Sequence, residues 1–387
     1  MKKLLICINN LKIGGIQKSL VGLLKQISNR YDITLFCINP VGEYVQDIPQ
    51  NIKFVSADRC LLASELSLKE AGSKGFVCFI TRVLCSAFSK VFGRRLPTYI
   101  LTSFLQKKIG TFDIAISFSQ PLGDKHFAIL TNEFVLNCCN ANTKITFVHC
   151  DFQDYGGNTA YNCMLYSRFD RIAAVSDSVA KKFLSVNPVL ADKTYTVFNC
   201  HDHDEIKMLS NNDPVIYGEQ IPILTVARLS SEKGLLRCLP VFTRLKENGF
   251  DVVWHIVGDG PLKGEIERGI VFHHLQGGVI LHGKQINPYR FMKNAAILLV
   301  PSFHEAAPMI FDEAMTLSLP IVSTDTTSAK ELVEARGIGW VCENSGRGIF
   351  DTLLDIIKHR KYLATEENSE RLVNDIAIEQ FINVIGG

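Results

Sequence analysis

Two cationic side chains follow a predicted strand in the second half of the chain. The segment ILTVARLSSEKG, residues 223–234, places Arg228 directly after an apolar run and Lys233 just before the next helical pattern. An arginine presents a planar fork of donors and a lysine a compact charge, and both stabilise the negative charge that builds on a departing phosphate. We therefore predict a diphosphate site here. The alternative is that both are solvated side chains of a loop.

Two glutamates follow another apolar run. In PSFHEAAPMIFDEAM, residues 301–315, seven residues separate Glu305 from Glu313. Pro308 suits the first turn of a helix, so we expect Glu305 in the loop and Glu313 about two turns into the helix, on an inward face. An inward carboxylate needs a partner. That partner is a ligand hydroxyl, a cation or the basic member of an internal salt bridge.

Glycines end a third apolar run, VVWHIVGDGPLKG, at Gly258 and Gly260. The segment is similar to a dinucleotide fingerprint, but the spacing differs and Pro261 interrupts it. Either a tight turn or the close approach of a ligand to the backbone would use these glycines. Gly15 opens a helix after the first strand, where backbone N–H groups can face a phosphate. His149 ends the run KITFVH, and is either a ligand-facing side chain or an ordinary core or surface histidine.

Short apolar runs that alternate with helical patterns must position these residues. Such runs, buried on both faces, indicate parallel strands joined by crossover helices, and hence an α/β fold. A length of 387 residues predicts two domains, with a cleft between them as the default site. We expect domains over 1–205 and 206–365, with an irregular boundary segment over 201–220, and a C-terminal helix over 366–387 that packs back on the first domain. The predicted strands are 4–8, 33–38, 53–57, 113–118, 144–149, 171–176 and 195–199, then 223–227, 252–258, 279–283, 296–302, 320–324 and 339–343.

Composition excludes several classes of protein. A net charge of +2 gives no global attraction to nucleic acid, and the 12 cysteines show no CxxC spacing of a zinc or redox site. No stretch reaches the roughly twenty apolar residues needed to span a bilayer, and the apolar run at the N-terminus is too short for a signal peptide. We therefore expect a cytoplasmic protein with reduced thiols.

The three segments in the second half resemble the donor site of the retaining glycosyltransferases of family four, which have the GT-B fold of two Rossmann-like domains facing each other across a cleft. The family has a strand followed by Arg-x4-Lys-Gly, a Gly-Asp-Gly-Pro turn and two glutamates with seven residues between them. All three occur here in that order. Over about residues 1–345 the likeness is strong in the second half and moderate in the first. It implies a sugar transferred from a nucleotide sugar, with a UDP-sugar as the expected donor and no cofactor.

The resemblance also implies roles. Arg228 and Lys233 hold the donor diphosphate, Glu313 the ribose hydroxyls, and Glu305 and His149 lie near the donor sugar; Arg228, Lys233, Glu305 and His149 are the expected catalytic residues. The other expected donor contacts are Gly15, Gly258, Gly260, Gly283, Lys284, Ala306, Ala307, Pro308, Met309 and Ile310. Relatives usually have Gly-Phe where this chain has Ala306 and Ala307, so sugar choice or loop geometry can differ. No metal site is expected, and we interpret Asp202-His203-Asp204 as a chance match to a metal-binding Asp-x-Asp.

A basic and aromatic segment lies in the first half. No acidic residue occurs between Glu70 and Asp113, whereas cations alternate with phenylalanines. This pattern suits a helix on an anionic membrane surface, or equally an amphipathic helix with a solvated basic face. The first interpretation favours a lipid-linked saccharide acceptor, as in capsule or O-antigen assembly. A GT-B-fold nucleotide-sugar 2-epimerase and a non-catalytic nucleotide-sugar-binding relative remain alternatives. The cations are Lys74, Arg82, Lys90, Arg94, Arg95, Lys107 and Lys108.

Overall fold

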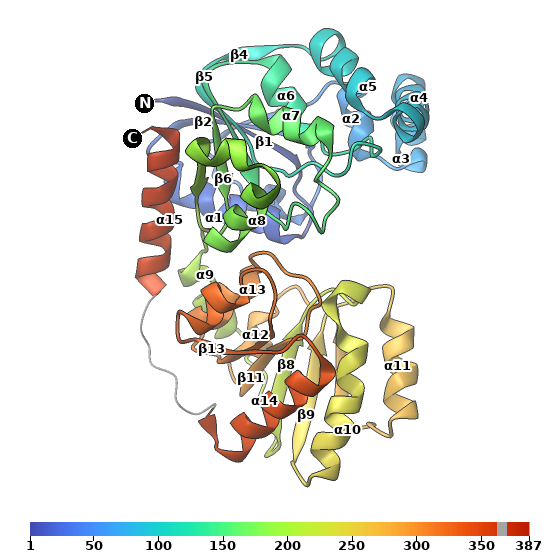
Figure 1. Cartoon of the computed structure of the whole chain (residues 1–387), viewed down its shortest axis with the longest axis vertical. Coiled ribbons are helices and arrows are strands. Elements are labelled where there is room, and N and C mark those ends of the chain that lie inside the picture. The colour runs from blue at the N-terminus through green and yellow to red at the C-terminus, as the bar shows by residue number, and fades with distance from the viewer. Residues whose placement is uncertain (362–369, 387) are drawn as a thin grey trace. The chain divides into compact units, whose positions relative to one another are not determined.

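The computed structural model describes residues 1–361 and 370–386. The chain folds into two compact units (Figure 1). The first unit holds Met1–His201 and Leu372–Gly387, and the second holds Asp202–Arg371. The division falls at 201/202, four residues before the boundary expected from the sequence. The start of the expected C-terminal helix, residues 366–369, and Gly387 lie outside the described residues.

A seven-stranded parallel sheet forms the centre of the first unit, in the order β3-β2-β1-β4-β5-β6-β7. The predicted strands are confirmed, and the apolar runs are buried because helices cover both faces of the sheet. Phe36 of β2 stacks on Phe134 of helix α6 (Thr131–Cys138) at 3.9 Å between ring centroids, which closes the core on one face. The strands are β1 (Lys3–Asn10), β2 (Asp32–Asn39), β3 (Lys53–Ser56), β4 (Ile109–Ser117), β5 (Cys139–Val148), β6 (Arg171–Ala174) and β7 (Thr194–Thr196).

The helices of the first unit include one long helix, α4, with few buried residues. Of the 17 residues of α4, only Cys78 and Ser89 are buried. The helices are α1 (Gly15–Ile27), α2 (Arg59–Leu62), α3 (Leu68–Ser73), α4 (Phe76–Phe92), α5 (Arg95–Ile100), α6 (Thr131–Cys138), α7 (Ala160–Ser167), α8 (Asp177–Val186) and α15 (Glu370–Ile385).

The C-terminal helix α15 packs on the first unit, although the whole second unit precedes it in the chain (Figure 1). The side chain of Asn374 forms two hydrogen bonds with the backbone of His201: it accepts from the N–H at 3.0 Å and donates to the carbonyl at 2.7 Å. Arg171 donates to the carbonyl of Val384 at 2.6 Å, and Phe381 is fully buried. The helix is therefore part of the core of this unit.

The second unit is also a parallel α/β sheet, in the order β10-β9-β8-β11-β12-β13. Trp254 of β9 stacks on Phe242 of α10 at 4.7 Å and donates to Thr225 at 3.0 Å, so its indole N–H is satisfied inside the core. The strands are β8 (Ile221–Val226), β9 (Val252–Val257), β10 (Val279–Gly283), β11 (Ile297–Val300), β12 (Ile321–Thr324) and β13 (Gly339–Cys342). The helices are α9 (His203–Ser210), α10 (Leu239–Glu247), α11 (Lys263–Phe272), α12 (Tyr289–Met292), α13 (Met309–Thr316) and α14 (Gly346–Lys358).

The expectation of an irregular segment over 201–220 was wrong at its start, where α9 forms. The side chain of Asp202 caps this helix by accepting from the N–H of Glu205 at 2.9 Å. Ile206 is buried in the core of the second unit, so tertiary packing stabilises a helix that is only two turns long. Asp202, the first residue of the Asp-x-Asp match, is thus a capping residue.

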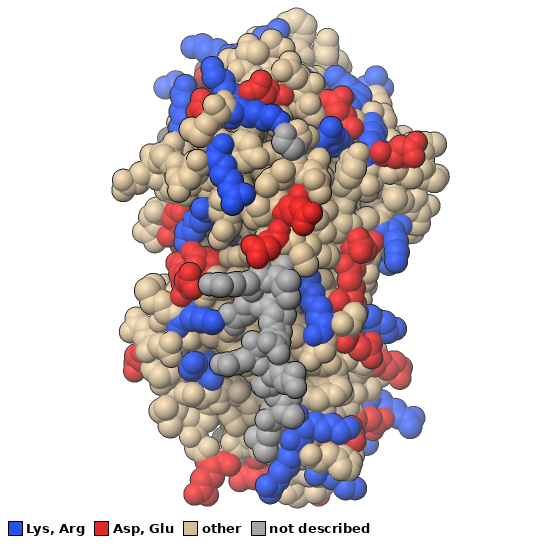
Figure 2. All heavy atoms as spheres, turned by 90° about the vertical axis from the view of Figure 1, so that its left-hand side faces the viewer, with Lys and Arg blue, Asp and Glu red and all other residues tan. Residues whose placement is uncertain are grey.

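Surface charge is mixed. On the face drawn in Figure 2, cationic and anionic side chains lie close to one another on both units, as the small net charge predicts. None of the described helices is long and apolar enough to cross a membrane.

Candidate functional site

Strands β8 and β11 are neighbours at the centre of the second sheet. From β8 the chain continues to β9 and β10 at one edge, and from β11 it continues to β12 and β13 at the other, so the strand order reverses between β8 and β11. In open α/β sheets such a switch point leaves a crevice at the carboxyl ends of the strands, where ligands bind. Arg228 and Lys233 follow β8, and Glu305 follows β11. The sheet therefore brings three of the predicted site residues to the two sides of one crevice.

Lys233 and Glu305 are in contact in this crevice. Nζ of Lys233 lies 2.5 Å from Oε1 of Glu305, and both side chains are largely buried, with 24% and 13% exposed. Ser302 donates to the same carboxylate oxygen at 2.8 Å, and the Glu305 carbonyl accepts from the N–H of Thr327 at 3.1 Å. Two donors and a backbone contact hold this carboxylate in one place.

Arg228 follows β8 and is 68% exposed. It donates to Glu232 at 2.7 Å, and Ser230 donates to the same oxygen at 2.6 Å. Partial burial of Glu232 opposes ionisation, but the hydrogen bonds from Ser230 and Arg228 outweigh it and lower the pKa of Glu232 to about 2. Glu232 is therefore an anion at neutral pH, and an entering phosphate would compete with it for Arg228.

Glycines let the backbones of neighbouring loops pass close to one another here. Gly234 has a φ of +66°, and a Cβ at this position would lie 2.1 Å from the Pro301 carbonyl oxygen. At Gly258, with a φ of +146°, a Cβ would lie 1.8 Å from the Ala227 carbonyl oxygen. A side chain fits at neither position. These contacts tie the loops after β8, β9 and β11 together.

The turn after β9 and the end of β10 are joined as well. The Gly258 N–H donates to the Gly283 carbonyl at 2.9 Å, and the Leu229 N–H to the Asp259 carbonyl at 2.9 Å. Gly260 packs against Leu229, since a Cβ there would lie 2.5 Å from its carbonyl oxygen. Lys284 follows Gly283 and is exposed. The predicted glycines thus shape adjoining loops of one crevice.

Helix α13 carries the second glutamate. Pro308 is its N-cap, and Glu313, in the second turn, is only 5% exposed. Its neighbour Asp312 pairs with Arg336 at 2.6 Å. Burial, followed by the charge of Glu313, raises the pKa of Tyr289, so that hydroxyl stays protonated. The loop before the helix, with Ala306, Ala307 and Pro308, is half-buried, as is Ile310, whereas Met309 is buried.

His149 lies in the first unit, directly after β5. Its ring stacks on Phe147 with a centroid distance of 5.4 Å and packs against Phe118 at 4.8 Å. Burial lowers the pKa of His149 to about 4, so the imidazole is neutral at physiological pH. Its Nε2 atom is buried and has no hydrogen-bond partner among the described residues.

The first unit also has a switch point, between β1 and β4. Ser119, just past β4, bonds Asn9 of β1, accepting from its N–H at 3.2 Å and donating to its side-chain oxygen at 3.0 Å. Gly15 opens α1 beyond the end of β1 and is exposed, while Gly14 has the extended conformation of an N-cap. Backbone N–H groups at this helix start are suited to an anion.

Sequence reasoning missed three residues that position the predicted ones. Gln120 accepts from the N–H of His149 at 2.7 Å and of Cys150 at 2.9 Å, and so fixes the turn that carries the histidine. Ser302 orients Glu305, and Glu232 holds Arg228. The spacing of Arg228 and Glu232, four positions apart, was a local signal for that pair. The other two contacts depend on tertiary structure. Within the described residues, no cluster of three His, Cys, Asp or Glu side chains could hold a metal.

Comparisons with known proteins place the chain among similar sequences and folds. The family described as Glycosyl transferases group 1 matches residues 209–372. An uncharacterized glycosyltransferase of Methanocaldococcus jannaschii is 32% identical over 37% of this chain and 37% of its own length. The amylovoran biosynthesis glycosyltransferase AmsK of Erwinia amylovora is 32% identical over 32% of each chain. The chain thus aligns with only about a third of the length of these relatives.

One relative aligns over nearly the full length. It is the N-acetylgalactosamine-N,N'-diacetylbacillosaminyl-diphospho-undecaprenol 4-alpha-N-acetylgalactosaminyltransferase of Campylobacter jejuni, 24% identical over 96% of this chain and 94% of its own. Among solved structures, Anabaena HepE in complex with UDP and glucose superposes with a TM-score of 0.66 at 16% identity, covering 100% of this chain and 97% of its own. These likenesses confirm the expected fold of two Rossmann-like domains and the resemblance to family four. The second unit of this chain therefore matches the glycosyl transferases group 1 family over residues 209–372, and the chain as a whole is similar to the GT-B glycosyltransferases of family four.

Proposed function

We propose that the chain is a retaining, metal-independent glycosyltransferase that moves a hexose-type sugar from a nucleoside diphosphate donor, a UDP-sugar, to a saccharide acceptor in bacterial surface polysaccharide assembly. The observation that carries the proposal is the contact between Lys233 and Glu305 across the switch point of the second unit. It holds one cation and one carboxylate side by side, which suits a ligand with a charged diphosphate next to a sugar hydroxyl.

Arg228 and Lys233 would neutralise the leaving diphosphate. As the bond from the anomeric carbon to the phosphate oxygen breaks, its electron pair stays on the diphosphate, and the two cations stabilise the added charge. The acceptor hydroxyl attacks the anomeric carbon from the face that the diphosphate leaves, and its proton passes to the departing phosphate. Donor and acceptor together supply all atoms of this exchange, so no covalent sugar–enzyme intermediate is needed.

The carboxylates would orient the donor. Glu305, fixed by Lys233 and Ser302, would accept a hydrogen bond from a hydroxyl of the sugar, and Glu313 from the ribose hydroxyls. The glycine turns at Gly258, Gly260 and Gly283, with Lys284, and the residues from Ala306 to Ile310 would give backbone and side-chain contacts along the donor. In the first unit, the neutral imidazole of His149 would contact the donor sugar, and the backbone N–H groups at the start of α1, at Gly15, would bind the phosphate.

The acceptor is proposed to be lipid-linked, with the enzyme at the inner face of the cell membrane. Support comes from an exposed apolar surface on α4, α5 and the turn that follows, where Phe76, Phe92 and Phe104 are 79%, 74% and 72% exposed. A solvated basic face would not expose so many large apolar side chains. Two of the seven cations of this segment instead point inward: Arg94 is fully buried, and Arg82 donates to the carbonyls of Ser64 and Phe127. The Campylobacter relative acts on a diphospho-undecaprenol-linked sugar by its name.

A melting-temperature screen tests donor binding. The full chain is heated with UDP, GDP, ADP, CMP and their common sugar conjugates, and UDP compounds are expected to raise the melting temperature by mass action. Slow transfer to water by the same protein should then release UDP and a free sugar whose first-formed anomer keeps the donor configuration, as detected by proton NMR. Release of the inverted anomer would contradict retention. A nucleotide sugar altered only at C2 would identify a 2-epimerase, and binding without any turnover a non-catalytic relative.

A further inference from the structure

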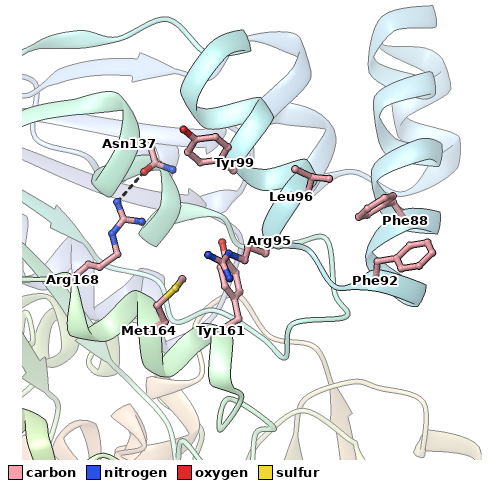
Figure 3. Close-up of a pocket in the computed structure, with 9 residues that line it drawn as sticks. All are labelled: Phe88, Phe92, Arg95, Leu96, Tyr99, Asn137, Tyr161, Met164 and Arg168. Carbon is pink, nitrogen blue, oxygen red and sulfur yellow. Dashed lines mark hydrogen bonds between the residues drawn. The ribbon is translucent and has the colours of Figure 1, made fainter.

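A pocket of about 710 Å³ lies in the first unit between α4, α5 and α7. Its walls are mostly apolar: Phe88 and Phe92 project from α4, Leu96 and Tyr99 from α5, and Met164 from α7 (Figure 3). Phe92, Leu96 and Tyr99 are 74%, 53% and 52% exposed, so the pocket opens on the exposed apolar surface of residues 76–105. Neither the donor diphosphate nor the nucleoside has been assigned to this part of the chain.

Two arginines line the same pocket. Arg95 comes from α5, and Arg168 follows α7 and donates to Asn137 at 3.3 Å (Figure 3). Neither takes part in an ion pair with any residue that the structure describes, and no acidic side chain lines the pocket. The pocket therefore combines an apolar wall with two uncompensated positive charges.

An acidic side chain that acts on Tyr161 of the pocket wall is already paired with another cation. Glu133 of α6 lies 3.3 Å from Nε of Arg94, and both side chains are buried. Arg94 also donates to Asn162 at 2.9 Å, and its guanidinium lies 5.7 Å from the ring centre of Tyr161, which lines the pocket. Burial, and next the charge of Glu133, raise the pKa of Tyr161, so its hydroxyl stays neutral. The charges of Arg94 and Glu133 thus balance each other, and the charges of Arg95 and Arg168 remain available to a ligand.

We propose that this pocket binds the lipid portion of the acceptor, a polyprenyl diphosphate, with the first isoprene units against the aromatic wall and the diphosphate between Arg95 and Arg168. The inference rests on the proposed function for its choice of lipid. Paired arginines match the bidentate geometry of phosphate oxygens, and burying a branched hydrocarbon chain against aromatic side chains stabilises the complex by the hydrophobic effect. The opening onto the exposed apolar surface gives the remaining chain a path into the bilayer.

Titration calorimetry with the full chain and farnesyl diphosphate, kept below its micelle-forming concentration, tests the proposal directly. Farnesyl diphosphate should bind, and inorganic diphosphate and farnesol should each bind at least tenfold more weakly, because each lacks half of the ligand. R95A and R168A should each weaken binding about tenfold. R30A is the matched control, since Arg30 is an exposed cation of the same unit that does not line the pocket, and it should bind normally.

Filling the pocket gives a second, independent test. M164W and L96W place an indole in the cavity from two different helices and should abolish farnesyl diphosphate binding while the protein keeps its melting temperature and its response to UDP. Equal binding of inorganic and farnesyl diphosphate would reduce the site to a simple anion site and overturn the proposal. So would unchanged binding in R95A, R168A and both tryptophan variants, or a loss in R30A as large as in R95A. Because this assay needs no turnover, a protein that binds the lipid but not UDP would refute the proposed transferase and not the pocket.

Discussion

Lys233 and Glu305 are 72 positions apart in the chain, yet Nζ of one lies 2.5 Å from Oε1 of the other. The contact is made across the two strands where the sheet order reverses, so it exists only in the folded second unit. A lysine that is already held by a carboxylate loses little further side-chain entropy when a phosphate arrives. The pair is thus a preorganised part of the proposed donor site.

Replacing Lys233 should therefore reduce transfer more than stability. K233A is expected to lower kcat at least about 100-fold, because one cation that stabilises the leaving diphosphate is lost. K233R should retain more activity than K233A, since it keeps the charge. Initial rates of UDP release measure both, and circular dichroism melting curves serve as the control for folding. Near-normal turnover in K233A would sink the diphosphate assignment.

Loss of Glu313 should weaken nucleotide binding. E313Q keeps the size of the buried side chain but removes its charge, and we expect it to reduce the rise in melting temperature that UDP causes. E247Q is the matched control, because Glu247 is an exposed glutamate of α10 that lies outside the proposed donor site. An unchanged UDP response in E313Q would remove the ribose role.

Chelation of divalent metals should leave activity intact. In the proposed donor site, Arg228 and Lys233 would supply the positive charge that a metal ion otherwise brings to the diphosphate. Initial rates are compared before and after dialysis against EDTA, with and without added Mg²⁺ or Mn²⁺. If EDTA abolished activity and either ion restored it, the reaction would require a metal ion. Asp202 and Asp204 would then be the first residues to replace.

The buried pair of Arg94 and Glu133 should matter for stability and not for chemistry. Their side chains are 0% and 1% exposed, so R94M leaves an uncompensated carboxylate in the core and should cost about 3–5 kcal/mol of unfolding free energy. The double variant R94M/E133L removes both charges and should be more stable than R94M. Urea denaturation of the three proteins measures the coupling. A double variant that is less stable than R94M would show that the pair does not act as a unit.

The free energy of unfolding should decrease as the pH falls, because His149 becomes protonated more readily in the unfolded chain than in the folded protein. Burial lowers its pKa from 6.5 to about 4, so between these values the unfolded chain binds the proton more strongly than the folded protein. The stabilisation that comes from this lowered pKa is complete above pH 6.5 and is lost as the pH falls toward 4. Its upper limit is about 3 kcal/mol of unfolding free energy. H149F removes the titrating imidazole. When the pH is lowered from 7.5 to 4.5, the unfolding free energy of H149F should therefore decrease less than that of the unmodified protein. His255, whose pKa burial also lowers to about 4, titrates in both proteins and cancels. Parallel pH profiles would contradict the assignment.

The strands were predictable because strands buried on both faces consist of continuous apolar residues; all six residues of β9, for example, are buried. Helix α9 was missed because it is short and polar on its outer side, and its stability comes from packing of Ile206. The burial of Arg94 was equally hidden, since the partners that make an internal arginine tolerable, Glu133 and Asn162, are distant in the chain. The site residues were predicted from motifs of fixed spacing, whereas partners such as Ser302 and Gln120 depend on strand neighbours that the spacing does not specify.

Helix α15 has a consequence for how the protein is made. Its residues Asn374, Gln380 and Phe381 complete the first unit, bonding or packing against a domain whose other residues end at His201. During synthesis the first 201 residues leave the ribosome well before this helix exists. The surface that α15 covers therefore stays open while the entire second unit is translated, and the nascent first unit must wait for α15 before it reaches its final stability.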